Sequence, residues 1–477
     1  MGAMAAFNAK RIEWGVFFTL VVGISILIGL NVRRLGFRFE SQPEMELDYV
    51  MGVLWWSVLA VAIAVFARLH RRMLLLAWVG KFFVVLVLML IYEYSYGLDA
   101  ISYHTTTKTG YYEYVYPGID FRRDMIPSLK PVTDEFGDPM GGLGTENFIR
   151  ILLLIASVTG PFFHAIKVVF AFLGLLGVWW FYQGVTVALG RPYPPAFYLL
   201  AFFPSIIFWS SIFGKDPLQF FFLGVYAYGV AVLLTQERLV SLWPLGVGII
   251  GSFMIRPWTA YMMIGALLLA RLVQNLRAWV VGFALLAVAA GALIRFSGLY
   301  YGGLEGGMIG DPEMIYELVR SVQLAQAQGG GSGGELLSEE GSLGASIPAI
   351  IFSGLFRPLP FDITNPFTAL AAIENSIVLG LTLAALYRIR LAFLRDPLLL
   401  WMGLYSLMWA ALYGFIVMAN FGAGARYKLQ VWPFLLLTLL LLTHREGRAL
   451  LLSRTVDRKT RNVSVGEPIL SLQRDSV

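Results

Sequence analysis

The stretch MLLLAWVGKFFVVLVLMLIYEYSYGLDAISYH, residues Met73 to His104, joins a long apolar run to a segment that carries two acids and a histidine. The run from Met73 to Tyr96 is long enough to cross a bilayer, which takes about 20 apolar residues in a helix. An ionisable side chain at the end of such a span is costly unless partners or water hold it, so Glu93 and Asp99 are candidate functional residues. A structural interpretation stands beside this one: Asp99 caps the following loop, and Glu93 pairs with a basic group inside the helix bundle.

The composition is typical of a membrane protein. Of the 477 residues, 58% are hydrophobic and 14% are charged, and the mean hydropathy is +0.71. Soluble domains have about 25% charged residues. The absence of cysteine excludes disulfides and thiolate metal sites, and the four histidines are too scattered to suggest zinc. The net charge of +6 fits basic cytoplasmic loops and a basic tail, so we expect no nucleic-acid partner.

We expect an all-α polytopic membrane fold with roughly 12 transmembrane helices, by the length rule. The membrane domain covers residues 1–443, with large external loops at about 97–147 and 298–347, and residues 444–477 form a basic cytoplasmic tail. The second loop contains the sequence GGGSGG, which is typical of flexible chain. The expected spans include residues 14–30, 49–67, 73–96, 162–187, 196–214, 367–386, 398–419 and 429–442.

Lys and Arg in short loops favour the cytoplasm, so the basic segment RLHRR, Arg68 to Arg72, is placed inside and Asp99 outside. The same assignment of loops to the two sides of the membrane places a set of polar residues at the outer face. Because Arg and Lys disfavour that face, we expect some of them to bind an anion there. Loop-end position and anchoring to lipid phosphate are the alternative explanations. The set is Asp99, Lys215, Asp216, Arg256, Arg357, Asp362, Asn420, Arg426 and Lys428.

Four segments carry a resemblance to a known superfamily. They are FFPSIIFWSSIFGKDPLQFFFLGVYAYG from Phe202, MIRPW from Met254, LFRPLPFDITNPFTALAAIEN from Leu355 and NFGAGARYKLQVWPFL from Asn420. Together they resemble bacterial membrane glycosyltransferases of the GT-C superfamily that use polyprenyl-phosphate-linked sugars. The resemblance implies a protein of the bacterial cytoplasmic membrane, involved in making cell-envelope polysaccharide, with its active site on the periplasmic or extracellular side.

The resemblance also implies a catalytic acid in the first large external loop, which in this chain is Asp99. Two features depart from the superfamily pattern. The acid follows the third expected span instead of the first, and GLDAIS offers one carboxylate where a D-x-D or E-x-D pair is typical. No cofactor is therefore assigned, and Mg²⁺ or Mn²⁺ stay open as candidate ions. The W-W-D motif of the oligosaccharyltransferase branch is not matched.

Sugar transfer from a lipid phosphate needs a base at the attacking hydroxyl and cations at the leaving phosphate. A carboxylate in a partly desolvated pocket suits the first role, which we assign to Asp99. Arg256, Arg426, Lys428 and Lys215 are the phosphate candidates. The remaining predicted substrate-binding or phosphate-binding residues are Glu93, Tyr103, His104, Asp216, Arg357, Asp362, Asn420 and Tyr427. An interfacial aromatic belt is the alternative explanation for the tyrosines.

The expected partners are a polyprenyl-phosphate sugar donor, a glycan, lipid or protein acceptor, and membrane lipids. Two other functions compete. A lipid-linked glycan polymerase or ligase would share the cluster of basic residues, but would rely on Arg and His more than on a loop Asp. A lipid or polysaccharide transporter would show charges or broken helices at mid-membrane, where the candidates are Lys81, Glu93 and Glu374.

The topology predicts a pattern of labelling. Because the chain has no native cysteine, single cysteines at Gly142 and Ser332 should react with an impermeant reagent from outside the cell. A cysteine at Ser453 in the tail should be protected. The opposite pattern would invert every assignment to the outer face.

Overall fold

The computed structural model describes residues 45–95, 99–115, 142–236, 242–274, 343–388 and 396–449, with a few isolated residues elsewhere. All regular elements within these ranges are helices, which confirms the all-α fold and the several apolar helices expected of a membrane protein. The expected span at 14–30 lies outside these ranges, and so does the GGGSGG tract.

Six described helices are long and apolar enough to cross a membrane, judged by length and composition. A seventh span results if α20 (Phe421–Tyr427), η5 (Lys428–Gln430) and α21 (Trp432–Thr443) count as one, with a bend of 66°. The described residues thus provide at most seven of the roughly 12 spans expected by length. The six are α2 (Met45–Phe66), α3 (Arg71–Phe83) continued through η1 (Val84–Leu88) and α4 (Met89–Ser95), α8 (Phe163–Leu189), α11 (Lys215–Gln236), α17 (Pro366–Arg388) and α19 (Pro397–Ala419).

The continuous span expected at 196–214 is not present. The chain instead forms α9 (Pro194–Phe202) and α10 (Pro204–Trp209), separated at Phe203. Phe203 is extended, with φ −63° and ψ 123°. Proline has no N–H to donate and forces the preceding residue out of the helical region, so Pro204 ends one helix and begins the next. The sequence SSIFG that follows is therefore a non-helical connection into α11.

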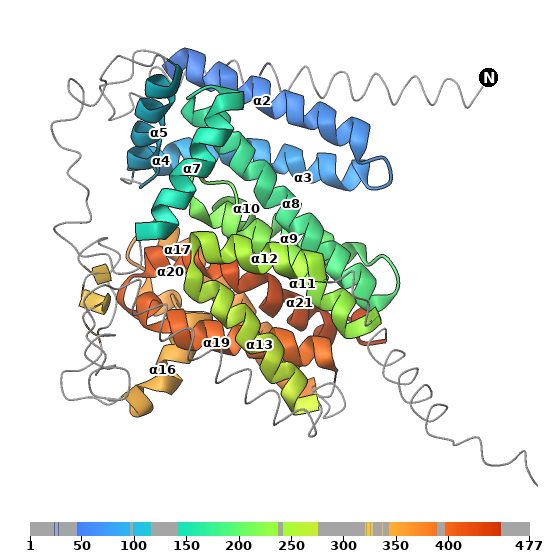
Figure 1. Ribbon diagram of the computed structural model, residues 1–477. Helices are drawn as coiled ribbons and strands as arrows, with labels where there is room; N and C mark the ends of the chain where they lie inside the picture. The colour runs from blue at the N-terminus through green and yellow to red at the C-terminus, as the bar shows by residue number, and fades with distance from the viewer. Residues whose placement is uncertain are drawn as a thin grey trace, which may run out of the picture. The chain divides into compact units, whose positions relative to one another are not determined.

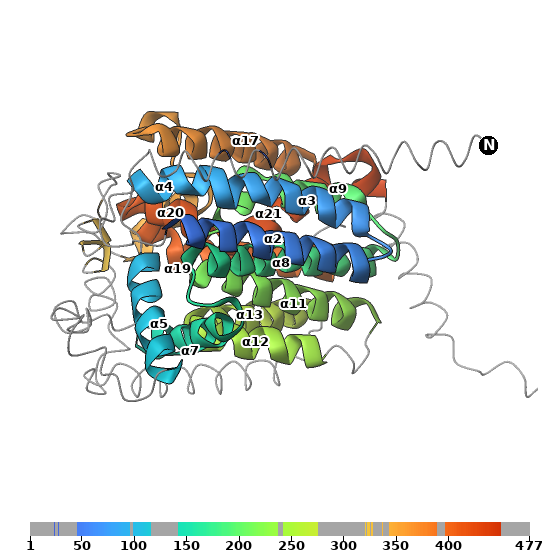
Figure 2. The same ribbon diagram turned by 90° about the horizontal axis from the view of Figure 1, so that it is seen from above.

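Shorter helices complete the described chain. Within the first predicted external loop the chain forms α5 (Asp99–Val115), which lies beside α7 (Gly142–Thr159) in both Figure 1 and Figure 2. The others are α12 (Leu242–Ile255), α13 (Pro257–Gln274), α16 (Leu343–Phe356) and η4 (Pro360–Asp362). The proline-interrupted segment after residue 346 is thus a helix of less than membrane-spanning length followed by a tight turn.

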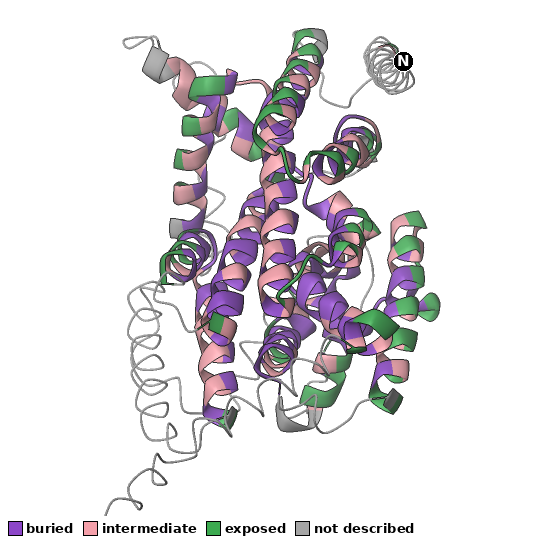
Figure 3. Ribbon diagram, turned by 90° about the vertical axis from the view of Figure 1, so that its right-hand side faces the viewer, coloured by how far each residue is buried: buried purple, intermediate pink, exposed green. Residues whose placement is uncertain are grey.

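Exposed apolar stripes support a membrane environment. Figure 3 shows helices with buried residues along one side and exposed residues along another. On α2 the buried side carries Tyr49, Trp56 and Ile63. The opposite side exposes apolar residues every three or four positions, which is the period of a helix. Such a continuous apolar surface is unfavourable in water and suits lipid. The exposed residues of α2 are Leu47, Val50, Leu54, Val58, Val61 and Val65.

The chain divides into two compact units, which are described separately. Unit 1 comprises Met1–Val178, Ala201–Phe222 and Gly251–Pro257. Unit 2 comprises Trp179–Leu200, Leu223–Ile250 and Trp258–Val477.

Within unit 2, α16 and α19 approach closely because glycines face the partner helix. A Cβ atom on Gly414 would overlap the carbonyl oxygen of Ile350. One on Gly354 would lie 2.9 Å from the carbonyl oxygen of Ala410. Small residues at a helix crossing let two backbones approach within van der Waals contact, which drives helix association in lipid.

We predict that Gly414→Ala destabilises unit 2. The added methyl meets backbone that cannot move aside, and overpacking of this kind typically costs about 1–3 kcal/mol. Gly403→Ala on the same helix is the control, because nothing lies within 4 Å of its Cβ position. Thermal unfolding in detergent should show a lower midpoint for Gly414→Ala only. Equal midpoints for the two variants would contradict a tight α16–α19 crossing.

Candidate functional site

The predicted site residues divide between the two units. Unit 1 holds Glu93, Asp99, Tyr103, His104, Lys215, Asp216 and Arg256. Unit 2 holds Arg357, Asp362, Asn420, Arg426, Tyr427 and Lys428. Each group is described within its own unit.

In unit 1, α5 places Asp99 and Tyr103 one helical turn apart. Residues four apart share a face of a helix, at a rise of about 6 Å. The Tyr103 ring packs edge-on against Phe148 of α7, with ring centroids 5.1 Å apart. Lys215 Nζ lies 5.6 Å from the centroid of the Tyr103 ring and donates to Thr145 Oγ1 at 2.7 Å. Asp99 therefore lies one turn before Tyr103 on α5, and Lys215 lies over the Tyr103 ring.

Asp99 is exposed at the first position of α5. This position differs from the partly desolvated pocket that we expected for a general base. The acids buried within the described part of unit 1 are instead Asp48, Glu93 and Asp216. The assignment of Asp99 as the base stays a prediction, and its exposure leaves it open to a substrate.

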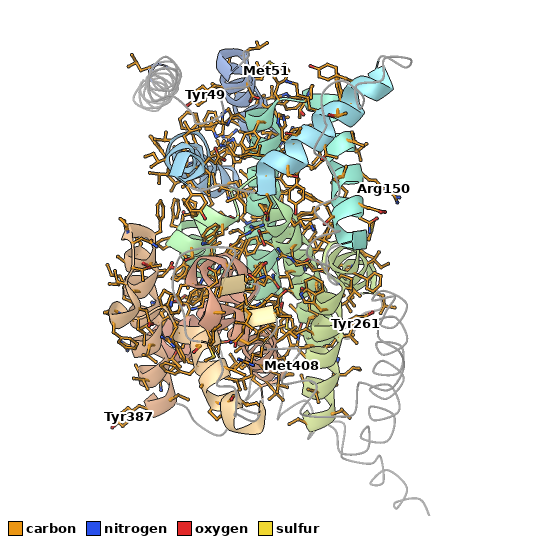
Figure 4. All side chains as sticks on the ribbon, turned by 90° about the vertical axis from the view of Figure 1, so that its left-hand side faces the viewer. Tyr49, Met51, Arg150, Tyr261, Tyr387 and Met408 are labelled. Atoms are coloured by element: carbon orange, nitrogen blue, oxygen red, sulfur yellow. The ribbon has the colours of Figure 1, made fainter. Side chains whose placement is uncertain are left out.

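Arg256 and Asp216 form a buried ion pair. Arg256 Nη2 lies 2.7 Å from Asp216 Oδ1, and the two side chains are 7% and 1% exposed. Asp216 lies in the first turn of α11, where a carboxylate interacts favourably with the positive end of the helix dipole. By contrast, Arg150 projects outward from α7 (Figure 4) and lies 3.8 Å from the exposed Glu146. Exposed pairs of that kind contribute about 0–1 kcal/mol to stability. The Arg150–Glu146 pair lies within α7, whereas the buried Arg256–Asp216 pair joins the end of α12 to the start of α11.

His104 is buried and neutral. Its Nε2 lies 2.8 Å from the carbonyl oxygen of Pro161. Because a carbonyl can only accept, Nε2 carries the proton. The ring packs edge-on against Phe163 at 5.4 Å. Burial lowers the pKa of the imidazole to about 4. In this structure His104 therefore contacts protein where we expected it to contact a sugar.

Glu93 pairs with Lys167, as the structural interpretation of the sequence anticipated. Lys167 Nζ donates to Oε1 at 3.0 Å and Oε2 at 2.9 Å. The Glu93 side chain is 6% exposed and the Lys167 side chain 0%. Sequence analysis missed Lys167, although a lysine inside the expected span 162–187 was a usable signal. It also missed Asp48, whose carboxylate accepts the backbone N–H groups of Phe163 and His164 at 2.7 Å each.

Lys81 is buried in the same unit but does not pair with Glu93. Its ammonium donates to the carbonyl oxygen of Ser210 at 3.1 Å and to Ser210 Oγ at 2.7 Å. It also donates to Ser211 Oγ at 2.9 Å. Lys81 thus holds the non-helical connection that follows α10.

In unit 2, Arg357 and Asp362 form a two-point ion pair. Arg357 Nε and Nη2 donate to the Asp362 carboxylate at 3.0 and 2.5 Å. The backbone N–H of Leu359 adds a third bond at 2.8 Å. Burial alone would raise the pKa of Asp362. The Arg357 hydrogen bonds, the Leu359 N–H and the Arg357 charge outweigh burial and lower that pKa below its ordinary value.

Lys428 donates to three protein acceptors. They are the carbonyl oxygens of Leu355 at 3.2 Å and Arg357 at 2.6 Å, and Asn375 Oδ1 at 3.0 Å. An ammonium group has three protons, so in this structure none is left for a phosphate. Lys428 instead ties η5 to the chain around the end of α16.

The other unit 2 candidates differ in exposure. Asn420 is buried, caps α20 through the N–H of Ala423 at 3.0 Å, and donates to the carbonyl oxygen of Gln326 at 3.0 Å. Arg426 and Tyr427 are partly exposed, and the Tyr427 ring lies 5.5 Å from that of Tyr413. These two therefore stay accessible to a ligand.

Among the described residues, no group of three or more His, Asp and Glu side chains is arranged to hold a metal ion. No protein-family model, curated protein or solved structure matches the chain. The glycosyltransferase resemblance therefore stays a prediction from the residues themselves.

We predict that His104 makes stability depend on pH. Its folded pKa of about 4 lies below the ordinary value of 6.5, so between these values the unfolded chain binds a proton that the folded chain does not. Its contribution is therefore fully present above pH 6.5 and is lost as the pH falls towards 4. His104→Gln keeps an amide donor for the Pro161 carbonyl but cannot titrate. Thermal midpoints measured from pH 7.5 to 4.5 should fall less steeply in the variant than in the wild type. Parallel curves would show that His104 titrates normally in the folded protein.

Proposed function

We propose that this protein is an integral membrane glycosyltransferase that moves a sugar from a polyprenyl-phosphate donor to a hydroxyl group of a glycan, lipid or protein at the outer face. The observation that carries the proposal is that Lys215 lies over the ring of Tyr103, which is one helical turn after Asp99 on α5 of unit 1. Asp99 and Lys215 are 116 positions apart in the chain. The family resemblance implies the role of Asp99, and Lys215 is one of the phosphate candidates that the chemistry requires.

The chemistry needs one base and one cation. We assign Asp99 the proton of the acceptor hydroxyl, whose oxygen bonds to the anomeric carbon as the bond from that carbon to the phosphate oxygen breaks. Negative charge then gathers on the departing polyprenyl phosphate. Lys215 is partly exposed and begins α11, so its ammonium and the first N–H groups of that helix both favour an anion.

Arg256 has a different role in this proposal. Its charge is directed at Asp216, so we place it behind Lys215, where it fixes the start of α11 against the end of α12. This assignment moves the leading phosphate role from Arg256 to Lys215. Arg426 and Tyr427, which are partly exposed in unit 2, stay candidates for binding the donor or acceptor.

The mid-span charges on which a transporter would depend have protein partners. Glu93 is held by Lys167, and Lys81 by Ser210 and Ser211. Glu374 is buried and is close enough to Lys428 to interact electrostatically with it. Fixed internal pairs of this kind favour an enzyme over a pathway for ions, and a polymerase or ligase is the competing class.

We predict that Asp99→Asn and Lys215→Ala separate the two roles. Asp99→Asn should lower sugar transfer by about 10²- to 10⁴-fold, the usual scale for acid–base catalysis, with polyprenyl-phosphate binding unchanged. Lys215→Ala should weaken both binding and transfer, and Lys215→Arg should restore part of each. Purified variants are assayed for lipid-phosphate affinity, transfer rate and thermal midpoint.

Arg191→Ala and Glu446→Gln are the matched controls, because each removes one charge, a cation and a carboxylate respectively, from an exposed ion pair in unit 2. Both should retain wild-type transfer. Full activity in Asp99→Asn would remove the base from the proposal and favour the polymerase or ligase class. Loss of folding in parallel with activity in both site variants would mean that these residues are structural.

A further inference from the structure

The segment 161–167, at the start of α8, contacts three other elements of unit 1. The Pro161 carbonyl accepts from His104 of α5 at 2.8 Å. The N–H groups of Phe163 and His164 donate to Asp48 of α2 at 2.7 Å each. One turn later, Lys167 binds Glu93 of α4. Gly160, at φ 75°, supplies the left-handed turn that separates α7 from this segment.

The polar contacts of this segment are made in a hydrophobic environment. Lys167 is fully buried and Glu93 is nearly so, and a buried charge whose partner is removed is strongly destabilised. Asp48 compensates the unpaired N–H groups and the positive dipole at the start of α8. The end of α4 therefore cannot separate from α8 unless a buried charge loses its partner or moves to water.

The same segment contacts residues that are close in sequence to both groups of the proposed site. Glu93 lies six positions before Asp99, with only residues 96–98 between α4 and α5. On the other side, the Phe163 ring stacks on Phe213 with centroids 4.9 Å apart and planes 16° apart. Phe213 is two positions before Lys215. The start of α8 therefore contacts one residue close in sequence to Asp99 and another close in sequence to Lys215.

We infer that Glu93 and Lys167 are positioning residues, which hold the end of α4, and with it the start of α5, against the start of α8 and thereby keep Asp99 near Lys215. The inference rests on the proposed function for its meaning in catalysis. It also changes the role of Glu93: both its carboxylate oxygens accept from Lys167, so Glu93 acts through α4 and not on a substrate.

The test uses the absence of native cysteine. Thr107 is fully buried on α5, so Thr107→Cys should react slowly with N-ethylmaleimide when α5 is in place. Adding Lys167→Met should raise the labelling rate at least tenfold, because unpaired Glu93 draws the end of α4, and α5 with it, towards water. The charge exchange Glu93→Lys with Lys167→Glu restores the pair and should return the rate towards that of the parent.

Two controls separate local movement from general loss of structure. Leu441→Cys, fully buried in α21 of unit 2, should stay protected when Lys167→Met is added. Lys81→Met removes the other lysine that is buried in the described part of unit 1, whose ammonium donates to the neutral oxygens of Ser210 and Ser211, and should leave Thr107→Cys protected.

Three results would overturn the inference: an unchanged rate at position 107 in Lys167→Met, a charge exchange as reactive as Lys167→Met, or equal increases at positions 107 and 441. The labelling needs no substrate, so its outcome is independent of the proposed function. That function fails separately, if the wild-type protein transfers no sugar from a polyprenyl-phosphate donor.

Discussion

The buried ion pair between Glu93 and Lys167 is the interaction on which the rest of unit 1 depends. Neither charge can be left alone among apolar side chains, so the end of α4 must lie against the second turn of α8. Asp48 fixes α2 at the first turn of α8, and His104 fixes α5 at Pro161, just before α8 begins. Three helices are thereby ordered by hydrogen bonds to four positions within residues 161–167, and apolar packing fills the space between them.

Buried polar contacts also order the helices of unit 2, through different residues. Lys428 donates to two carbonyl oxygens near the end of α16 and to Asn375 of α17, while Arg357 and Asp362 close the turn between those helices. Hydrophobic association gives little direction to helices that are already in lipid, so specific packing and polar contacts supply it. In both units, several charges that invite a catalytic interpretation serve to order helices.

The groups that we propose to be reactive lie at the starts of helices, outside the buried polar contacts. Asp99 and Lys215 lie at the first positions of α5 and α11, and both are more exposed than the pairs behind them. Buried groups with complete hydrogen bonding have no capacity left for a ligand, whereas groups at helix starts can meet one without disturbing the core. This division favours Lys215 over Lys428 as a phosphate ligand.

The sequence by itself determined the membrane class, the all-α fold and most described spans, because apolar length and helical period are local properties of the chain. It also brought forward Asp99, Lys215 and Arg256, since charges stand out at the ends of apolar runs. Which charge meets which was decided only by tertiary structure. Glu93 meets Lys167 across 74 positions and Asp48 meets His164 across 116, and no local pattern encodes those distances. The break at Pro204 is a different case: hydropathy continues through it, but the missing N–H and the ring of proline are local features that divide the span.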